Sequence, residues 1–105
     1  RSRFELDMTY QTKPEVLKKI QEELLKYLNE HPQTDENSRV FFSEFASHSL
    51  KLLVFYFAKT NDFFEFMKIR DEINFKIHEI VTQNGGDFAF PTQTIFLKNN
   101  EPPQK

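Results

Sequence analysis

Apolar and polar residues alternate over residues 1–10, which predicts a β-strand with one buried face and one more polar face. Two further segments, residues 39–47 and 50–58, are rich in strand-forming side chains, and the second is apolar on both faces. A last segment of strand-forming types covers residues 88–97 and follows a turn at Gly85 and Gly86. The pattern therefore predicts four strands.

Between these strands, apolar residues recur at steps of three and four, which predicts two amphipathic helices. The first helix has Thr12 as its expected N-cap, with Glu15 at the capping-box position, and it stops before Pro32. The second has Asp62 as its expected N-cap and ends at Gly85. The two apolar stripes are Leu17, Ile20, Leu24 and Leu28, then Phe66, Ile69, Ile73, Ile77 and Ile80.

The resulting order, β-α-β-β-α-β, predicts an α+β fold of the ferredoxin-like type. Two right-handed crossovers give a four-stranded antiparallel sheet with both helices on one face. In that plait the first and third strands are central, and the second and fourth lie at the edges. Pro91 cannot donate a ladder hydrogen bond, which agrees with an edge position for the last strand. We expect one domain over residues 1–98 and a polar, proline-containing tail over residues 99–105.

One face of the predicted sheet is left uncovered by the helices. The third strand presents Leu53, Phe55 and Phe57 on this face, and Phe41 or Phe42 is expected beside them. Large apolar side chains gathered on an open face are typical of a contact surface. The chain also has 13 phenylalanines among 105 residues, more than one sheet face and two helices need. We therefore interpret these positions as interface candidates.

Composition narrows the possible partners. The net charge is -2 and the basic residues are scattered, so there is no electrostatic case for binding nucleic acid or an anionic membrane surface. There are no cysteines, and no apolar run approaches the roughly 20 residues that a membrane helix needs. Because the chain begins at Arg1, without an initiator methionine or signal peptide, we expect it to be a piece of a longer protein.

No pattern in the chain strongly indicates a catalytic or metal-binding site. His31, His48 and His78 lack the spacing of metal ligands and are interpreted as surface or turn residues. There is no glycine-rich phosphate loop before a helix and no nucleophile elbow. The paired acids at residues 35–36 and 71–72 lie in a loop and on a solvated helix face, which does not favour general acid–base catalysis. The sequence therefore predicts no catalytic, cofactor or metal site, and no enzyme.

Two other classes of domain share the predicted strand order. RNA-recognition domains need glycines and basic residues with aromatics on the third strand, and residues 50–55 contain no glycine. A free-standing ferredoxin-like module that binds a small regulatory molecule has no such requirement, because its site can be formed by backbone groups. This module is the alternative that the residues leave open.

The segment from Gly85 to Leu97 resembles the end of the cytoplasmic region of the small-conductance mechanosensitive channel family. In that family a glycine-containing turn precedes an aromatic-proline element, a polar pair and a strand. Residues 47–54 are similar to the family's turn and third strand, and residues 73–77 to its last helix. The signature residues of this resemblance are Phe90, Pro91, Thr92 and Gln93.

The resemblance implies a subdomain of the cytosolic vestibule of a membrane channel. Family members are homo-heptamers whose cytoplasmic parts form a cage, with openings that let solutes and ions reach a pore opened by membrane tension during osmotic shock. It implies the cell inner membrane for the intact protein, with this part facing the cytoplasm and touching the membrane only through absent transmembrane helices. We expect the fragment to be a monomer or dimer. The polar residues 99–105 do not favour the small C-terminal barrel of the family.

Overall fold

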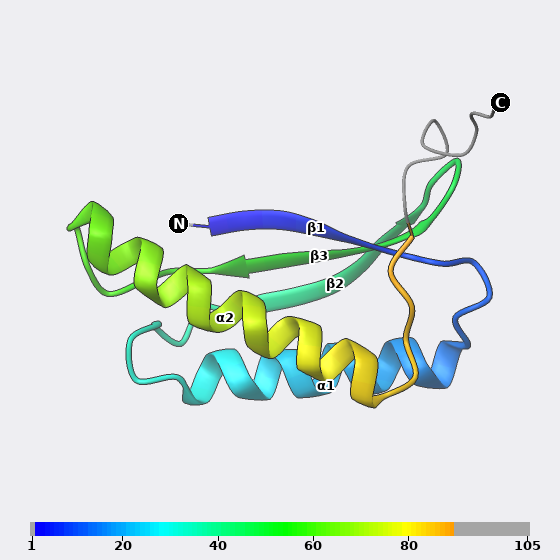
Figure 1. Ribbon diagram of the computed structural model, residues 1–105, viewed down its shortest axis with the longest axis horizontal. Helices are drawn as coiled ribbons and strands as arrows, with labels where there is room; N and C mark the ends of the chain where they lie inside the picture. The colour runs from blue at the N-terminus through cyan, green and yellow to red at the C-terminus, as the bar shows by residue number, and fades with distance from the viewer. Residues whose placement is uncertain (1, 90–105) are drawn as a thin grey trace, which may run out of the picture.

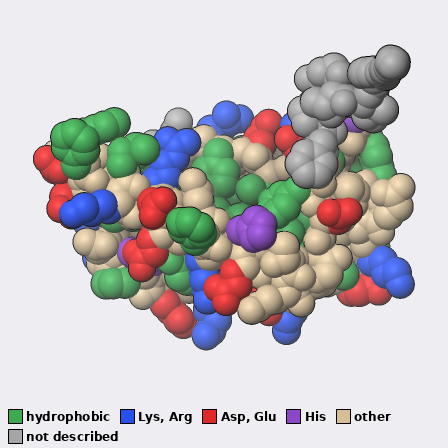
Figure 2. All heavy atoms as spheres, viewed as in Figure 1, with side chains coloured by type: hydrophobic (Ala, Val, Ile, Leu, Met, Phe, Trp, Pro, Cys, Tyr) green, Lys and Arg blue, Asp and Glu red, His purple; other side chains and the backbone are tan. Residues whose placement is uncertain are grey.

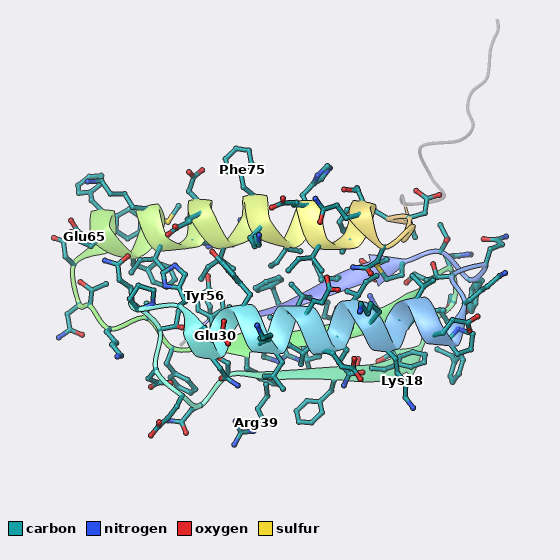
Figure 3. All side chains as sticks on the ribbon, turned by 90° about the horizontal axis from the view of Figure 1, so that it is seen from below. Lys18, Glu30, Arg39, Tyr56, Glu65 and Phe75 are labelled. Carbon is teal, nitrogen blue, oxygen red and sulfur yellow. The ribbon has the colours of Figure 1, made fainter. Side chains whose placement is uncertain are left out.

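The computed structural model describes residues 2–89. They form an α+β fold with a three-stranded antiparallel sheet in the order β1-β3-β2 and two helices on the same side of it (Figures 1 and 3). Residues 90–105 lie outside the described residues. They include most of the predicted fourth strand, the four signature residues and the predicted tail. The elements are β1 (Ser2–Met8), α1 (Pro14–Glu30), β2 (Arg39–Phe45), β3 (Leu50–Tyr56) and α2 (Phe63–Gln83).

The central strand β3 sets the register of the sheet. It pairs with β1 from Ser2↔Tyr56 to Met8↔Leu50 without interruption. Its pairing with β2 shifts by one residue between Phe42 and Glu44, so Ser43 lies in a β-bulge. A tight turn joins β2 to β3, and within it the Ala46 N–H donates to the Ser49 carbonyl at 2.8 Å.

The core lies between the sheet and the helices, and the predicted apolar stripes form it. On β3, alternate residues face the helices and are buried, because successive side chains of a strand point to opposite faces. Phe66 is the one member of the predicted stripes that is only half-buried. The buried members are Leu17, Ile20, Leu24 and Leu28 of α1, Leu50, Leu52, Val54 and Tyr56 of β3, and Ile69, Ile73, Ile77 and Ile80 of α2.

The predicted start of α1 is wrong by one residue. The helix begins at Pro14 with Lys13 as its N-cap, and no side chain caps it. Proline fits the first helical position because its missing N–H has no partner there. Thr12 therefore lies one residue too early to cap the helix, and its hydroxyl instead meets that of Thr9 at 3.0 Å.

Both ends of α2 follow the sequence prediction. Asp62 is the N-cap, and its Oδ2 accepts the Glu65 N–H at 2.8 Å. At the other end Gly85 has φ +80°, which glycine adopts without steric cost. The Gly85 N–H bonds to Thr82 O and the Gly86 N–H to Val81 O, which together make a Schellman motif.

After α2 the chain returns along the free side of β1. Thr9 N–H donates to Asp87 O at 3.0 Å and Ala89 N–H donates to Asp7 O at 2.8 Å, with Phe88 opposite Met8. Residues 87–89 thus run antiparallel to β1, on the side away from β3. The predicted four-stranded fold has its fourth strand on this side of β1.

Candidate interaction surfaces

Side chains that point away from the helices form the surface that we call the open face. The register places each β3 residue of this face between one residue of β1 and one of β2. Directly opposite residues share a face in an antiparallel pair, so the open face is a grid of three rows. The rows are Arg3, Phe55 and Arg39; Glu5, Leu53 and Phe41; and Asp7, Lys51 and Glu44.

The apolar part of the open face contains two of the predicted interface candidates. Leu53 and Phe55 lie there and are half-buried. Phe41 is 49% exposed and packs edge to face on Phe55, with ring centroids 6.5 Å apart. Phe57 follows the end of β3, and its carbonyl accepts the Asp35 N–H at 2.9 Å. Phe41, rather than Phe42, is therefore the β2 aromatic that lies beside Leu53 and Phe55.

Phe42 lies on the helix side of the sheet, because it pairs with the fully buried Leu52. It packs on Phe45, with ring centroids 5.1 Å apart, and both rings line a groove of about 670 Å³ between α1 and β2. Sequence reasoning missed this groove, and the imperfect alternation of residues 39–47 was its only signal. The lining residues are Tyr10, Thr12, Pro14, Glu15, Leu17, Lys18, Gln21, Phe42, Phe45 and Leu50.

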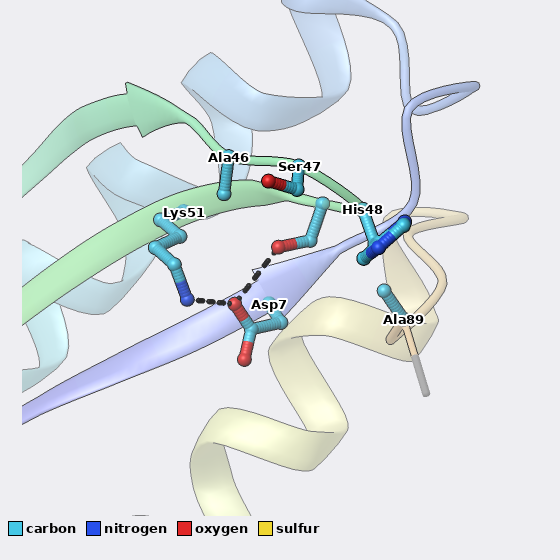
Figure 4. A pocket seen from close by; sticks show the side chains of 7 residues that line it. Asp7, Ala46, Ser47, His48, Lys51 and Ala89 are labelled. Atoms are coloured by element: carbon cyan, nitrogen blue, oxygen red, sulfur yellow. Dashed lines mark hydrogen bonds and ion pairs between the residues drawn. The ribbon is translucent and has the colours of Figure 1, made fainter. Parts of the chain in front are cut away.

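A charged cluster ties β1 to β3 at one end of the open face (Figure 4). Lys51 Nζ lies 2.6 Å from Asp7 Oδ1 and 3.3 Å from Glu5 Oε1. The Ser49 hydroxyl donates to the same Asp7 oxygen at 3.0 Å. Asp7, Ser49 and Lys51 of this cluster line a pocket of about 350 Å³ together with residues 46–48 and Ala89.

The cluster shifts the pKa values of both its central groups. Burial raises the pKa of Asp7, but the hydrogen bonds from Lys51 and Ser49 and the lysine charge outweigh burial, so this pKa lies below 3.8. The hydrogen bond to Asp7 raises the pKa of Lys51 above 10.5. Both groups are therefore charged at neutral pH, which suits a structural ion pair rather than proton transfer.

The three histidines lie apart from one another. His31 is buried, contrary to the sequence interpretation, and its Nε2 lies 3.0 Å from Glu72 Oε1. Its Nδ1 accepts the Gln33 N–H at 3.0 Å, so the ring proton is assigned to Nε2. His48 and His78 are exposed, and His78 stacks on Phe88. Within residues 2–89 no group of three or more acidic, histidine or cysteine side chains could hold a metal ion.

The outer face of α2 carries a second exposed apolar surface. Figure 2 shows hydrophobic side chains gathered over the N-terminal end of this helix, and Phe75 points outward farther along it (Figure 3). Phe63 and Phe64 are 66% and 74% exposed. Neither helix in the described part of the chain is long and apolar enough to cross a membrane.

Comparison with known proteins gives a consistent result. Residues 3–88 match the family model described as mechanosensitive ion channel MscS, C-terminal. An MscS family protein of Aquifex aeolicus is 42% identical, and the alignment covers 93% of this chain and 27% of that protein. The low conductance mechanosensitive channel YnaI of Escherichia coli is 36% identical over 82% of this chain and 26% of its own length.

An archaeal protein agrees with these two. The small-conductance mechanosensitive channel MscMJ of Methanocaldococcus jannaschii is 36% identical over 90% of this chain and 27% of its own length. The chain thus spans about a quarter of the length of the curated relatives it matches.

Proposed function

Because the chain belongs to the MscS family of mechanosensitive ion channels, whose C-terminal domain it matches, we propose that it forms part of the cytoplasmic vestibule of such a channel. Its role there is architectural and non-enzymatic. It shapes the cage through which solutes and ions reach a tension-gated pore, and it packs against other subunits. One observation carries this proposal. The open face of this MscS-family domain has an apolar centre, formed by Phe41, Leu53 and Phe55.

The open face supports a packing role through its composition. Phe41, Leu53 and Phe55 offer contiguous apolar side chains on a sheet face that neither helix covers. A face of this kind gains free energy when a neighbour removes it from water, by about 25 cal/mol for each Å² of apolar surface. The family resemblance implies seven copies in the intact protein, located in the inner membrane with this domain in the cytoplasm.

We further propose that residues 88–97 complete a four-stranded ferredoxin-like plait. The hydrogen bonds of residues 87–89 along β1 support this arrangement. Pro91 cannot donate a ladder hydrogen bond, which suits a strand at the edge of the sheet.

The proposed packing role is tested by Phe55→Asp in the full-length channel protein. We expect the substitution to weaken assembly, measured by the mass of the detergent-solubilised particle, because a carboxylate replaces a desolvated aromatic ring. In the chain of residues 1–105 we expect a loss of only about 1 kcal/mol, since Phe55 is half-buried and Phe41, which packs on it, is itself 49% exposed. The flanking Arg3 and Arg39 offset part of that loss.

Phe75→Asp is the matched control, because Phe75 is 73% exposed on α2, away from the open face. Two results would contradict the proposal. One is an assembled particle of unchanged mass with Phe55→Asp. The other is a loss of several kcal/mol in the isolated chain, which would place Phe55 in the core.

A further inference from the structure

The turn that ends α2 contains an asparagine followed directly by a glycine, Asn84 and Gly85. In such a pair the backbone nitrogen of the second residue can attack the side-chain carbonyl carbon of the first, which deamidates the asparagine. Glycine has no β-carbon to hinder this approach. The chain has only two glycines, Gly85 and Gly86, so no other asparagine is followed by glycine.

The deamidation of Asn84 proceeds in two steps and consumes only water. The Gly85 nitrogen loses its proton and bonds to the side-chain carbonyl carbon of Asn84, and the side-chain nitrogen leaves as ammonia, which gives a five-membered cyclic imide. Water then adds to one imide carbonyl and breaks its bond to the Gly85 nitrogen. Opening at the side-chain carbonyl gives aspartate, and opening at the main-chain carbonyl gives isoaspartate, in which the backbone runs through the β-carbon. No atom is oxidised or reduced.

The backbone of the folded domain holds Asn84 in a conformation that cannot close this ring. Closure needs the Gly85 nitrogen on the same side of the Asn84 Cα–C bond as the β-carbon. Asn84 has ψ 5°, which places the Gly85 nitrogen beside the Asn84 nitrogen instead. The Gly85 N–H also donates to Thr82 O at 3.1 Å, so the attacking nitrogen is engaged in a hydrogen bond.

The side-chain amide of Asn84 is fixed by both helices. Its Nδ2 donates to the Ile80 carbonyl at 2.8 Å and to Glu23 Oε1 of α1 at 2.9 Å. Both partners are acceptors, so they assign the amide nitrogen to this position. The group that has to leave as ammonia is therefore held in place, and ring closure requires the last turn of α2 to unwind and the contact with α1 to break.

We propose that Asn84 is a deamidation site that the folded domain keeps closed and that local unwinding at the C-terminal end of α2 opens. The product does not fit the native contacts. A carboxylate at this position loses the donated hydrogen bonds, faces the Glu23 carboxylate, and lies at a helix C-terminus, where the helix dipole disfavours negative charge. Deamidation therefore converts a transient unwinding into a lasting loss of the contact between α1 and α2.

The isoaspartate product disturbs the packing further, because it lengthens the backbone two residues before Gly86. Gly86 lies so close to the core that an added β-carbon would be 2.9 Å from Ile20 and 3.0 Å from the Val81 carbonyl oxygen. A longer backbone shifts Gly86 relative to these neighbours. It also displaces residues 87–89, which are hydrogen-bonded along β1.

The rate of deamidation tests whether the fold controls the site. The chain of residues 1–105 is incubated at mildly alkaline pH, and mass spectrometry follows the peptide that contains Asn84. We expect the folded chain to react at least about tenfold more slowly than the same chain in guanidinium chloride, because ring closure waits for local unfolding. Both aspartate and isoaspartate should form, as the cyclic imide requires.

Substitution of Glu23 tests the contact between the helices. We expect Glu23→Ala to speed deamidation of the folded chain about fivefold, because it removes one of the two acceptors that hold the amide, and to leave the rate in guanidinium chloride unchanged. Glu22→Ala, at an exposed position next to it on α1, is the matched control and should not change either rate. Melting curves for each variant confirm that the domain is folded.

Asn84→Asp carries the carboxylate of one product and measures its effect on the fold. We expect it to raise the equilibrium constant for unfolding in urea about tenfold. Adding Glu23→Gln should recover about threefold of this loss, because the glutamine N–H groups can donate to the new carboxylate. Asn29→Asp also places an anion in the last turn of a helix, at an exposed position on α1, and should have a smaller effect.

Four results would overturn the inference. Equal rates in the folded and unfolded chains would show that the fold does not control the site, and no reaction at Asn84 in the unfolded chain would show that it is not a deamidation site. A Glu23→Ala chain that reacts no faster would exclude the role of the helix contact. Equal stability of the Asn84→Asp and Asn29→Asp chains would show that the product is tolerated. The proposed channel role is independent of all four, since Phe55→Asp in the full-length protein tests it.

Discussion

At the scale of single residues, the ion pair between Asp7 and Lys51 shows how position in the sheet determines behaviour. In the sequence both residues are ordinary charged positions within predicted strands. The register places them directly opposite each other on the open face, and Ser49 adds a hydrogen bond to the same carboxylate oxygen. The stability of the domain should consequently depend on pH through this pair.

The direction of that dependence follows from the shifted pKa values. Asp7 has a folded pKa below its ordinary 3.8, so its contribution is fully present above pH 3.8 and is lost as pH falls through the folded value. Lys51 has a folded pKa above 10.5, so its contribution is present below pH 10.5 and is lost as pH rises through the folded value. The pair therefore stabilises the fold across the neutral range.

We predict that Asp7→Asn lowers the free energy of unfolding by less than about 1 kcal/mol at pH 7, because the Asp7 side chain is 42% exposed and screened by solvent. The difference between Asp7→Asn and the original chain should shrink below pH 3.8 and in high salt. Urea unfolding of both chains at pH 7 and pH 3 measures this difference in the free energy of unfolding. Glu22→Gln, at an exposed position on α1, is the control. A difference that stays constant with pH would contradict the assignment.

At the scale of elements, the helix ends show where local sequence is sufficient. Asp62 was identified correctly as an N-cap because its oxygen needs only the N–H three residues later. The cap of α1 was misplaced because Pro14, rather than Thr12, determined the first helical residue. The glycine pair after α2 was predicted as a turn, but the separate roles of its two residues depend on tertiary contacts.

We predict that Gly86→Ala destabilises the domain more than Gly85→Ala does. A β-carbon at Gly86 would lie 3.0 Å from the Val81 carbonyl oxygen and 2.9 Å from Ile20, so the backbone or core must shift, at a cost of about 2–3 kcal/mol. At Gly85 a β-carbon meets no heavy atom within 4 Å among the described residues, and only the positive φ costs about 1 kcal/mol. Equal midpoints of urea unfolding would contradict this order.

At the scale of the whole molecule, the edge of the sheet at β1 is only partly covered by the described residues. The outer side of β1 receives residues 87–89, while its helix-side residues Phe4 and Leu6 are only partly buried against the core. A fourth strand beside β1 would extend that core and protect the edge. The stability of shortened chains can therefore test the proposed plait.

We predict that a chain ending at residue 98 unfolds at the same urea concentration as the full chain, whereas a chain ending at residue 89 is less stable by about 2–3 kcal/mol. The shorter chain loses the proposed strand and leaves Phe4 and Leu6 less covered. If both shortened chains are equally stable, residues 90–98 do not form a stabilising strand in the isolated domain.

The sequence by itself determined the order of the five described elements and the residues of the core. These features follow from period-two and period-three-to-four patterns and from short-range capping, which depend on neighbouring residues. The family was indicated separately, by the resemblance of short segments such as residues 47–54 and 85–97. Only the tertiary structure decided that Phe41 lies beside Leu53 and Phe55, while Phe42 faces the groove. Adjacent residues of a strand point to opposite faces, and the bulge at Ser43 changes the register within β2. The placement of Arg3 and Arg39 on either side of Phe55 was likewise settled by cross-strand pairing, because these three residues are distant in the chain and become neighbours only through hydrogen-bond register.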